Sequence, residues 1–222
     1  HPDENYAREI NQLFSIGLVK LNLDGTPQLS GGQPIPTYNQ AVITNFAHVF
    51  TGWKWSDCSA ANFTSCGPDY TTGINFQTPM AAFAAYHDNG THPVNDIANK
   101  QLLSYPGAVN GGVLANGGTP QSDLAFALDN IFNYPNLGPF LGKQLIQRLV
   151  TSNPSPDYVG AVARVFANNG AGVRGDLKAV VKAILMHPEA RQVSDHSGKL
   201  REPVLRLAAY LRAFGATSES GF

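Results

Sequence analysis

Five apolar stripes at helical spacing fill the C-terminal half of the chain, and they constrain its fold more than any other feature. Four of the five stripes begin at a capping residue or beside a proline, and the stripes end near a glycine, asparagine or proline, which are the usual signals for helix ends. The predicted helices begin near Thr119, Pro139, Ser155, Val173 and Glu202. Because the connections between them are short, the helices are expected to lie antiparallel to their neighbours. The sequence therefore predicts a helical bundle over residues 119–215.

Two more helices are predicted in residues 1–53. The first begins at the acidic Asp3, which complements the unpaired amides and positive end of a helix, and runs to Ile16. The second is expected to begin at Thr37 as N-cap and to run through Phe50. In each predicted helix the large apolar side chains share one side, and we expect these stripes to be buried. The stripes are Tyr6, Ile10, Leu13 and Phe14 in the first helix, Tyr38, Val42, Phe46 and Val49 in the second, and Leu124, Leu128, Ile131 and Phe132 in the helix that begins near Thr119.

Residues 54–118 are rich in glycine, proline, asparagine and aromatic residues and show no long helical period. Short strands are predicted at residues 74–76 and 82–86, and Asp24-Gly25 is a typical hairpin turn. The expected fold is mainly α, an irregular helical bundle with one or two small β-hairpins and a loop-rich middle. We expect residues 1–222 to form a single domain.

The charge and the apolar pattern of the chain exclude two classes of partner. Lys and Arg number 15 and Asp and Glu number 16, so the formal net charge is −1. Without a basic field the chain is not expected to bind nucleic acid. No apolar run approaches the ~20 residues that a membrane-spanning helix needs.

The two cysteines, Cys58 and Cys66, lie in one short polar loop. The sequence favours a disulfide between them, which would stabilise the fold by roughly 2–3 kcal/mol. Two unpaired thiols are the alternative, and zinc would need two further ligands that no fixed spacing supplies. A disulfide implies an extracytoplasmic location, periplasmic or secreted.

Five segments of the chain, in order, carry a resemblance to a known family. Residues 3–10 match the family's Asn-Glu-Asn-Tyr-Ala-Arg-Glu-Leu helix, and residues 50–53 match its aromatic-Thr-Gly-Trp turn. Residues 87–92 match its His-Asp-x-Gly-x-Lys motif. Residues 143–150 match its Lys-Leu-Ile-Arg-Arg-Phe-Val segment, and residues 199–213 match its closing helix. At the end of the third motif His92 replaces the lysine. The chain resembles the bacterial family called domain of unknown function 1800. The resemblance implies that this is the C-terminal part of a larger protein, and that the missing, largely helical N-terminal part is its partner.

His87 and Asp88 are the first candidates for chemistry. A neutral imidazole beside a carboxylate can bind a metal or relay a proton. The alternative is structural: Asp88 caps the turn and His87 bonds a backbone carbonyl. As a hypothesis, Asp88 accepts hydrogen bonds within its turn while His87 faces a cleft lined by the first helix, so that His87→Ala would leave folding nearly intact.

Glu9 is the second candidate, on a polar helix side that it shares with Glu4 and Arg8. Carboxylates on one helix can do acid–base work or bind a divalent metal with help from another segment. The alternative is that Arg8 and Glu9 form buried ion pairs, for instance with Arg201 or Arg212. The catalytic candidates are thus His87, Asp88 and Glu9.

Three functions remain open at this point. The leading interpretation is a non-enzymatic helical module that binds or scaffolds a partner. The second is a metal-dependent or other hydrolase with a site near His87 and Asp88. The third is a carbohydrate- or polymer-binding surface built on Trp53, Trp55, Tyr70 and Tyr86. The familiar nucleophile-elbow, phosphate-loop, dinucleotide and zinc-protease motifs are absent, so the sequence names no cofactor and no substrate.

Overall fold

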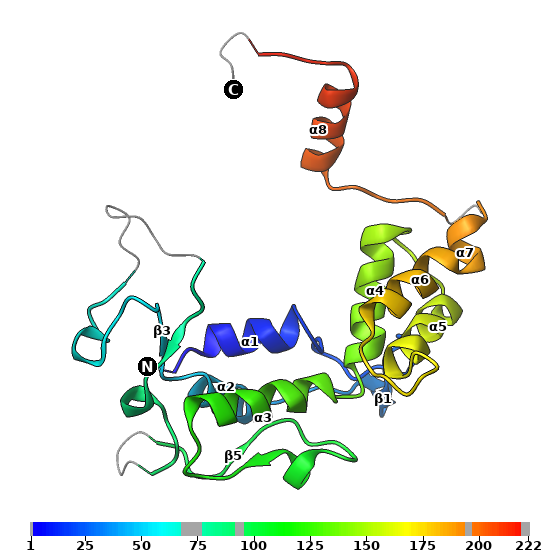
Figure 1. Cartoon of the computed structure of the whole chain (residues 1–222). Coiled ribbons are helices and arrows are strands. Elements are labelled where there is room, and N and C mark those ends of the chain that lie inside the picture. The colour runs from blue at the N-terminus through cyan, green and yellow to red at the C-terminus, as the bar shows by residue number, and fades with distance from the viewer. Residues whose placement is uncertain (1, 68–76, 92–95, 194–196, 219–222) are drawn as a thin grey trace. The chain divides into compact units, whose positions relative to one another are not determined.

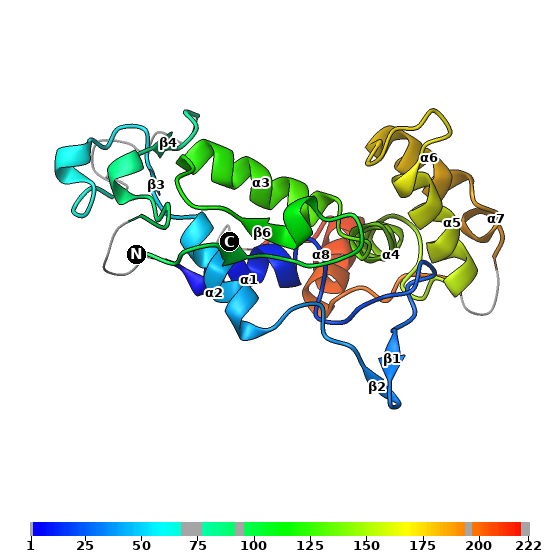
Figure 2. The same ribbon diagram turned by 90° about the horizontal axis from the view of Figure 1, so that it is seen from below.

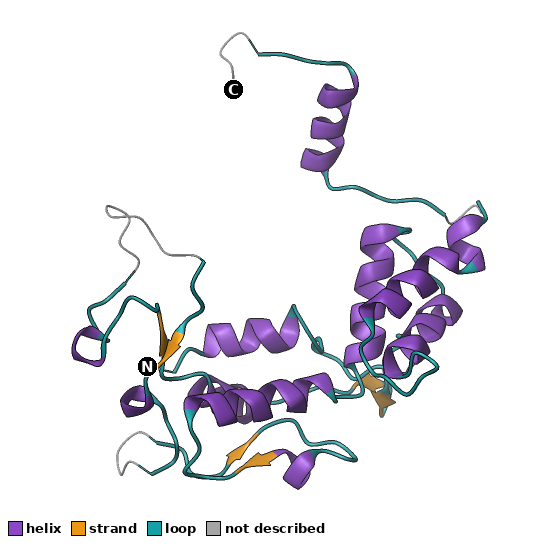
Figure 3. Cartoon of the chain, viewed as in Figure 1, coloured by secondary structure: helices purple, strands orange, loops and turns teal. Residues whose placement is uncertain are grey.

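The structure is a computed structural model that describes residues 2–67, 77–91, 96–193 and 197–218. The chain divides into two compact units, His1–Leu141 and Gly142–Phe222, and each is described by itself. The described residues form eight α-helices, three 3-10 helices and three two-stranded antiparallel sheets (Figures 1 and 3). The prediction of a mainly α fold with small β-hairpins is therefore confirmed. A single domain stays a prediction.

The elements follow one another along the chain with these bounds. The α-helices are α1 (Glu4–Gln12), α2 (Gln40–Val49), α3 (Pro120–Phe132), α4 (Leu137–Leu149), α5 (Pro156–Ala167), α6 (Leu177–Met186), α7 (Pro188–Arg191) and α8 (Pro203–Ala213). The strands are β1 (Leu29–Ser30), β2 (Gln33–Pro34), β3 (Trp53–Lys54), β4 (Ala81–Ala82), β5 (Lys100–Gln101) and β6 (Val113–Leu114), and the 3-10 helices are η1 (Ala60–Asn62), η2 (Ala84–Tyr86) and η3 (Val109–Gly112).

The core of the first unit lies between α1, α2, α3 and the β5–β6 pair. Helix α2 is central, because it contacts α1, α3 and β5 (Figures 1 and 2). Its buried side chains are Ile43, Phe46, Ala47 and Val49. They pack with Ala7 and Ile16 from the N-terminal segment, Leu102, Leu103 and Leu114 from the β5–β6 region, and Ala127, Ile131 and Tyr134 from the α3 region.

Helix α1 begins as predicted but buries a different side. Asp3 is its N-cap and accepts a hydrogen bond from the Tyr6 amide at 3.0 Å. The buried residues are Ala7 and Asn11, with Ile10 half-buried, whereas Phe14 is 73% exposed. The predicted stripe is thus wrong except at Ile10; Tyr6 and Leu13 are exposed too. The small Ala7 side chain allows α1 to approach α2 closely, and the helix ends at Gln12, before Leu13 and Phe14 can continue the stripe.

Helices α2 and α3 also differ in detail from the prediction. The N-cap of α2 is Asn39, not Thr37; Thr37 is buried and donates a hydrogen bond to the Gly17 carbonyl at 2.6 Å. Thr119 caps α3 as expected, in a reciprocal capping box with Ser122.

Of the stripes predicted for these helices, Phe46, Val49 and Ile131 are buried, whereas Tyr38, Val42 and Leu124 are half-buried and Leu128 and Phe132 are exposed. The inner side of α3 instead carries two buried polar residues, Asp123 and Asn130. Asn130 bonds both backbone groups of Leu103, its Oδ1 accepting from the amide at 3.0 Å and its Nδ2 donating to the carbonyl at 2.9 Å.

The small sheets fix the chain around the core. The turn at Asp24-Gly25 forms, with Asp24 Oδ1 accepting from the Thr26 amide at 2.9 Å, but the chain flanking it makes only isolated bridges. The tight hairpin is the following one, β1–β2, whose tip is Gly31-Gly32 with positive φ at both residues. The β3–β4 pair brings Trp53 opposite Ala82 and so joins residues 51–54 to residues 81–88. The strand predicted at 82–86 is partly right, since β4 ends at Ala82 and η2 follows; residues 74–76 lie outside the described residues.

The second unit packs α5 against α6. Its buried side chains include Tyr158, Val162 and Phe166 of α5 and Val180 and Ile184 of α6. The Tyr158 hydroxyl donates to the Ile184 carbonyl at 2.6 Å. Ser155 caps α5, as expected, and Asp176 caps α6, which begins later than predicted. No helix among the described residues combines the length and apolar character that a bilayer span requires.

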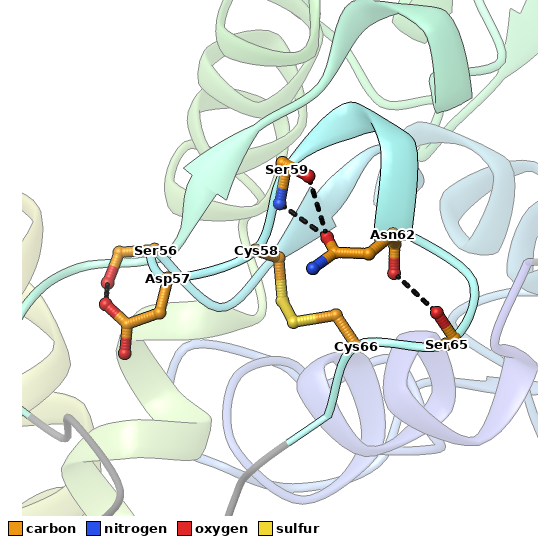
Figure 4. The surroundings of a disulfide bond; sticks show 7 residues. All are labelled: Ser56, Asp57, Cys58, Ser59, Asn62, Ser65 and Cys66. Carbon is orange, nitrogen blue, oxygen red and sulfur yellow. Dashed lines mark hydrogen bonds between the residues drawn. A yellow bond between two sulfur atoms is a disulfide. The ribbon is translucent and has the colours of Figure 1, made fainter.

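The predicted disulfide between Cys58 and Cys66 is confirmed (Figure 4). The loop that it closes is also held by Asn62, whose side-chain oxygen accepts from the Ser59 amide at 2.7 Å and from the Ser59 hydroxyl at 3.0 Å. The loop thus has its own covalent and hydrogen-bonded framework.

Substitutions on the two sides of the α1 segment should have unequal effects. Ala7→Leu is expected to lower the free energy of unfolding by about 1–3 kcal/mol, because Ala7 is fully buried and added methyl groups must displace the core. Phe14→Ser, at an exposed site, should change it by less than about 0.5 kcal/mol. Urea denaturation measures both, and equal losses would contradict the assigned face.

Removal of the disulfide has a predicted cost as well. The double substitution Cys58→Ser and Cys66→Ser is expected to lower the free energy of unfolding by about 2–3 kcal/mol, because the short cross-linked loop gains freedom in the unfolded chain. Ser65→Ala, next to the bridge, is the control and should have little effect. Alkylation of two thiols in the freshly isolated native chain would refute the bridge itself.

Candidate functional site

Six polar side chains of the first unit form one connected network. They are His48 on α2, Thr51 after α2, His87 and Asp88 after η2, Lys100 on β5 and Asp123 on α3. We call them the polar network. The β3–β4 pairing sets their register, because the Phe83 amide donates to the Gly52 carbonyl at 2.7 Å and places His87 beside Thr51.

Gly52 shows why this approach is so close. Its φ is +81°, and a Cβ at that position would lie 2.9 Å from the His87 Cβ. A residue with a side chain would therefore be strained in its backbone and would also meet His87. Glycine at position 52 is thus what allows the Thr51-Gly52 segment to lie directly against His87-Asp88.

His87 is 2% exposed, and both of its ring nitrogens face acceptors. Nε2 lies 3.0 Å from Asp123 Oδ2, and Nδ1 lies 3.1 Å from the Thr51 carbonyl oxygen. Nδ1 also lies 3.3 Å from the Thr51 hydroxyl oxygen, so the enclosed ring has hydrogen-bond partners at both nitrogens. Gly118 makes room for this pair, because a Cβ there would lie 1.7 Å from Asp123 Oδ1.

Asp88 collects four groups with its two carboxylate oxygens. Oδ1 accepts from the Gly90 amide at 2.9 Å and lies 3.0 Å from Lys100 Nζ. Oδ2 accepts from the Ile97 amide at 3.0 Å and bonds His48 Nδ1. Burial acts to raise the pKa of the Asp88 carboxyl, but the bonds from Ile97, Lys100, His48 and Gly90 outweigh it, and the pKa is lowered below its usual value.

Thr51 joins the two halves of the network. Its hydroxyl donates to the His48 carbonyl at 2.6 Å and accepts from the Asp88 amide at 2.8 Å. Lys100, which is fully enclosed, donates a further bond to the Ile97 carbonyl at 3.0 Å. The buried charges of Lys100 and Asp88 are therefore paired, as a protein interior of low polarity requires.

The structure confirms one part of the sequence hypothesis and corrects another. Asp88 does accept a bond within its own turn, from Gly90. The expectation that His87 faces a cleft is wrong, because the ring is enclosed and bonded at both nitrogens. The two side chains diverge because neighbouring residues of an extended chain point to opposite sides.

Glu9 does not join the polar network. Its Oε2 is buried and has no hydrogen-bond partner among the described residues. Arg8 donates to Gln40 Oε1 at 3.0 Å. A catalytic role for His87, Asp88 and Glu9 together stays a hypothesis, and the contacts described do not bring the three side chains into one site.

Of the aromatic residues expected to form a glycan platform, Tyr86 is engaged within the chain itself. The Tyr86 ring stacks on Phe63 with centroids 4.0 Å apart, and its hydroxyl donates to the Ala60 carbonyl at 2.8 Å. Trp53 and Trp55 are half-buried, and Tyr70 lies outside the described residues. One face of Tyr86 is therefore covered by the protein itself.

Four members of the polar network were not among the sequence candidates: His48, Thr51, Lys100 and Asp123. Their partners lie 36 to 40 residues away in three of the contacts, His87–Asp123, Thr51–His87 and His48–Asp88. No local spacing signals contacts of that range. Among the described residues no cluster of three or more His, Cys, Asp and Glu side chains is arranged to hold a metal.

Comparison with known proteins assigns the family. The sequence model of the family described as "Protein of unknown function (DUF1800)" matches residues 1–220. The chain belongs to the DUF1800 family. No curated protein and no solved structure matches the chain significantly. In this DUF1800 chain, the segments 50–53 and 87–92, which carry the resemblance, are the ones that supply Thr51, Gly52, His87 and Asp88.

The enclosed His87–Asp123 pair yields a double-mutant prediction. His87→Leu alone is expected to lower the free energy of unfolding by about 3–5 kcal/mol, because it leaves the Asp123 carboxylate buried without its partner. His87→Leu combined with Asp123→Leu should lose less than the single variant, since the orphaned charge is gone. Urea denaturation measures both, with the exposed Asp129→Leu of α3 as control. A near-neutral His87→Leu would restore the sequence expectation of a free imidazole.

Proposed function

We propose that this DUF1800 chain is a helical binding or scaffolding module of an exported bacterial protein, and that α8 is its docking element. The observation that carries the proposal is the exposure of α8, which has no buried residue. The Cys58–Cys66 disulfide supports export, because such bonds persist in oxidising compartments.

The exposed side of α8 is organised for helix packing. Val204, Leu207, Leu211 and Phe214 are separated by three, four and three residues, which is the spacing of the contact positions of a coiled coil. Val204 is 70% exposed and Phe214 73%. A side chain of this kind gains about 1.5–3 kcal/mol when it is fully buried. An apolar stripe of this length in water is typical of a protein interaction site.

We infer that the occupant of this stripe is the N-terminal part of the parent protein. The family resemblance implies such a part and implies that it is largely helical, and a helix in a groove between helices is a common mode of recognition. The hydrolase and glycan alternatives gain no support from the residues that motivated them, because His87 is enclosed and Tyr86 is stacked on Phe63.

Substitutions in α8 should act in the parent protein and not in the chain alone. Leu207→Asp with Leu211→Asp is expected to lower the melting temperature of the full-length parent by several degrees, because two charges would enter the interface. The same double variant of the chain alone should melt like the wild type, since neither side chain is buried in it. Differential scanning calorimetry of the four proteins measures this.

Arg206→Ala, on the same helix and exposed, is the matched control and should be neutral in both contexts. An unchanged melting temperature of the double variant in the parent would contradict the proposal. A loss of equal size in the chain alone would show that α8 serves its own unit.

A further inference from the structure

The first unit contains a pocket of about 200 Å³ that shares no residue with the polar network. Two tyrosine rings and two prolines, from the segments that follow β5 and α3, form its walls: Tyr105, Pro106, Tyr134 and Pro135. The two rings meet edge to face, with centroids 5.3 Å apart. The Tyr105 hydroxyl donates to the Asn130 carbonyl at 2.9 Å and the Tyr134 hydroxyl to the Thr37 carbonyl at 3.3 Å. Because both hydroxyls bond the protein itself, the walls offer a ligand mainly apolar surface.

Hydrogen bonds hold the polar side of the pocket in place. The Lys20 amide donates to the Ile35 carbonyl at 2.8 Å, and the Lys20 carbonyl accepts from the Gln28 amide at 2.7 Å. Gln28 and Asn136 also line the pocket, and their side chains bond the two backbone groups of Leu21, Gln28 Nε2 at 2.8 Å and Asn136 Oδ1 at 2.7 Å. The pocket is therefore largely formed before any ligand arrives, as small-molecule sites usually are.

Lys20 is the charged residue of this pocket. It is half-buried, and its ammonium makes no hydrogen bond or ion pair with any residue that the structure describes. No aspartate or glutamate lies among the described residues that line the pocket, so nothing in the lining neutralises this cation. Ser104, on the exposed rim, adds a hydroxyl that also has no partner in the described part of the chain. One cation and one hydroxyl beside apolar walls favour a ligand with a single negative charge.

We propose that this pocket binds a small aromatic monocarboxylate, with its ring against Tyr105 and Tyr134 and its carboxylate at Lys20. An apolar cavity of about 150 Å³ is enough for one benzene molecule, so the volume of this pocket accommodates one ring and a carboxylate. Pockets for drug-sized ligands are larger, at about 300–1,000 Å³. A ring at these walls gains edge-to-face contacts in addition to burial. A sugar fits less well, because Asn136 and both tyrosine hydroxyls already bond the backbone and leave few partners for its hydroxyls.

Binding of benzoate to the intact chain tests the proposal. Titration followed by NMR should show one saturable site, and Lys20→Met should weaken binding by about tenfold or more, because it removes the charge-assisted hydrogen bond but keeps the apolar stem. Benzamide, which has the same shape without the charge, should bind the wild type more weakly than benzoate does. Lys182→Met, at an exposed position of α6 in the other unit, is the matched control and should bind benzoate as the wild type does. No saturable binding of benzoate, or wild-type affinity in Lys20→Met, would overturn the proposal.

Two further measurements cover the case in which Lys20→Met fails to fold. In the wild-type chain, benzoate should shift the backbone amide signals of Lys20, Ser104 and Tyr105, and shifts confined to other segments would overturn the proposal. Ser104→Trp places an indole at the exposed rim, where a larger side chain does not disturb the core. This variant should melt like the wild type and lose benzoate binding because the indole fills the pocket, and undiminished binding would contradict the site. Neither measurement depends on α8 or on its docking partner.

Discussion

The buried carboxylate of Asp88 is the point at which the first unit is tied together. It contacts α2 through His48 and the strand β5 through Lys100, and it accepts hydrogen bonds from two loops through the amides of Gly90 and Ile97. A buried ion pair adds little net stability compared with an apolar contact of the same shape, but removal of one partner is costly. The network therefore contributes more to selecting one arrangement of these segments than to the free energy of unfolding. The short helices and two-residue strands around it depend on the network for their relative positions.

Amide side chains perform the same task elsewhere in the unit. Asn130 bonds both the amide and the carbonyl of Leu103, as a neighbouring strand would. Asn136 donates to the carbonyls of Ile16 and Val19 and accepts from the Leu21 amide at 2.7 Å. Side chains thus satisfy backbone groups that a loop-rich fold would otherwise leave unpaired in its interior.

Local signals in the sequence predicted what is local in the structure. Helix caps at Asp3, Thr119 and Ser155, and the bridge between Cys58 and Cys66, depend on residues a few positions apart, and all four are present. The buried side of α1 could not be predicted from such local signals, because packing against α2 decides that Ala7 is buried and Phe14 is exposed. The large apolar stripe was the stronger pattern, but close approach of two helices favours the small side.

The candidate site shows the same division. His87 and Asp88 were singled out for their chemistry, and they do lie at the centre of a polar network. Their partners could not be found, because Asp123, Lys100 and His48 are brought to them by tertiary packing. An isolated His-Asp pair in a turn is compatible with an open cleft or with an enclosed hydrogen-bonded network, and only the partners distinguish the two.

The separation of those partners has a consequence for how the first unit folds. His48, His87 and Asp123 lie 36 to 40 residues from the groups they pair with, and loops of that size must close before any of the pairs can form. A half-assembled network would leave charges dehydrated without a partner, so intermediates of that kind are disfavoured. The polar network should therefore form late in the folding of the first unit and in one cooperative step. Folding should proceed at the slower rates typical of chains whose contacts are distant in sequence.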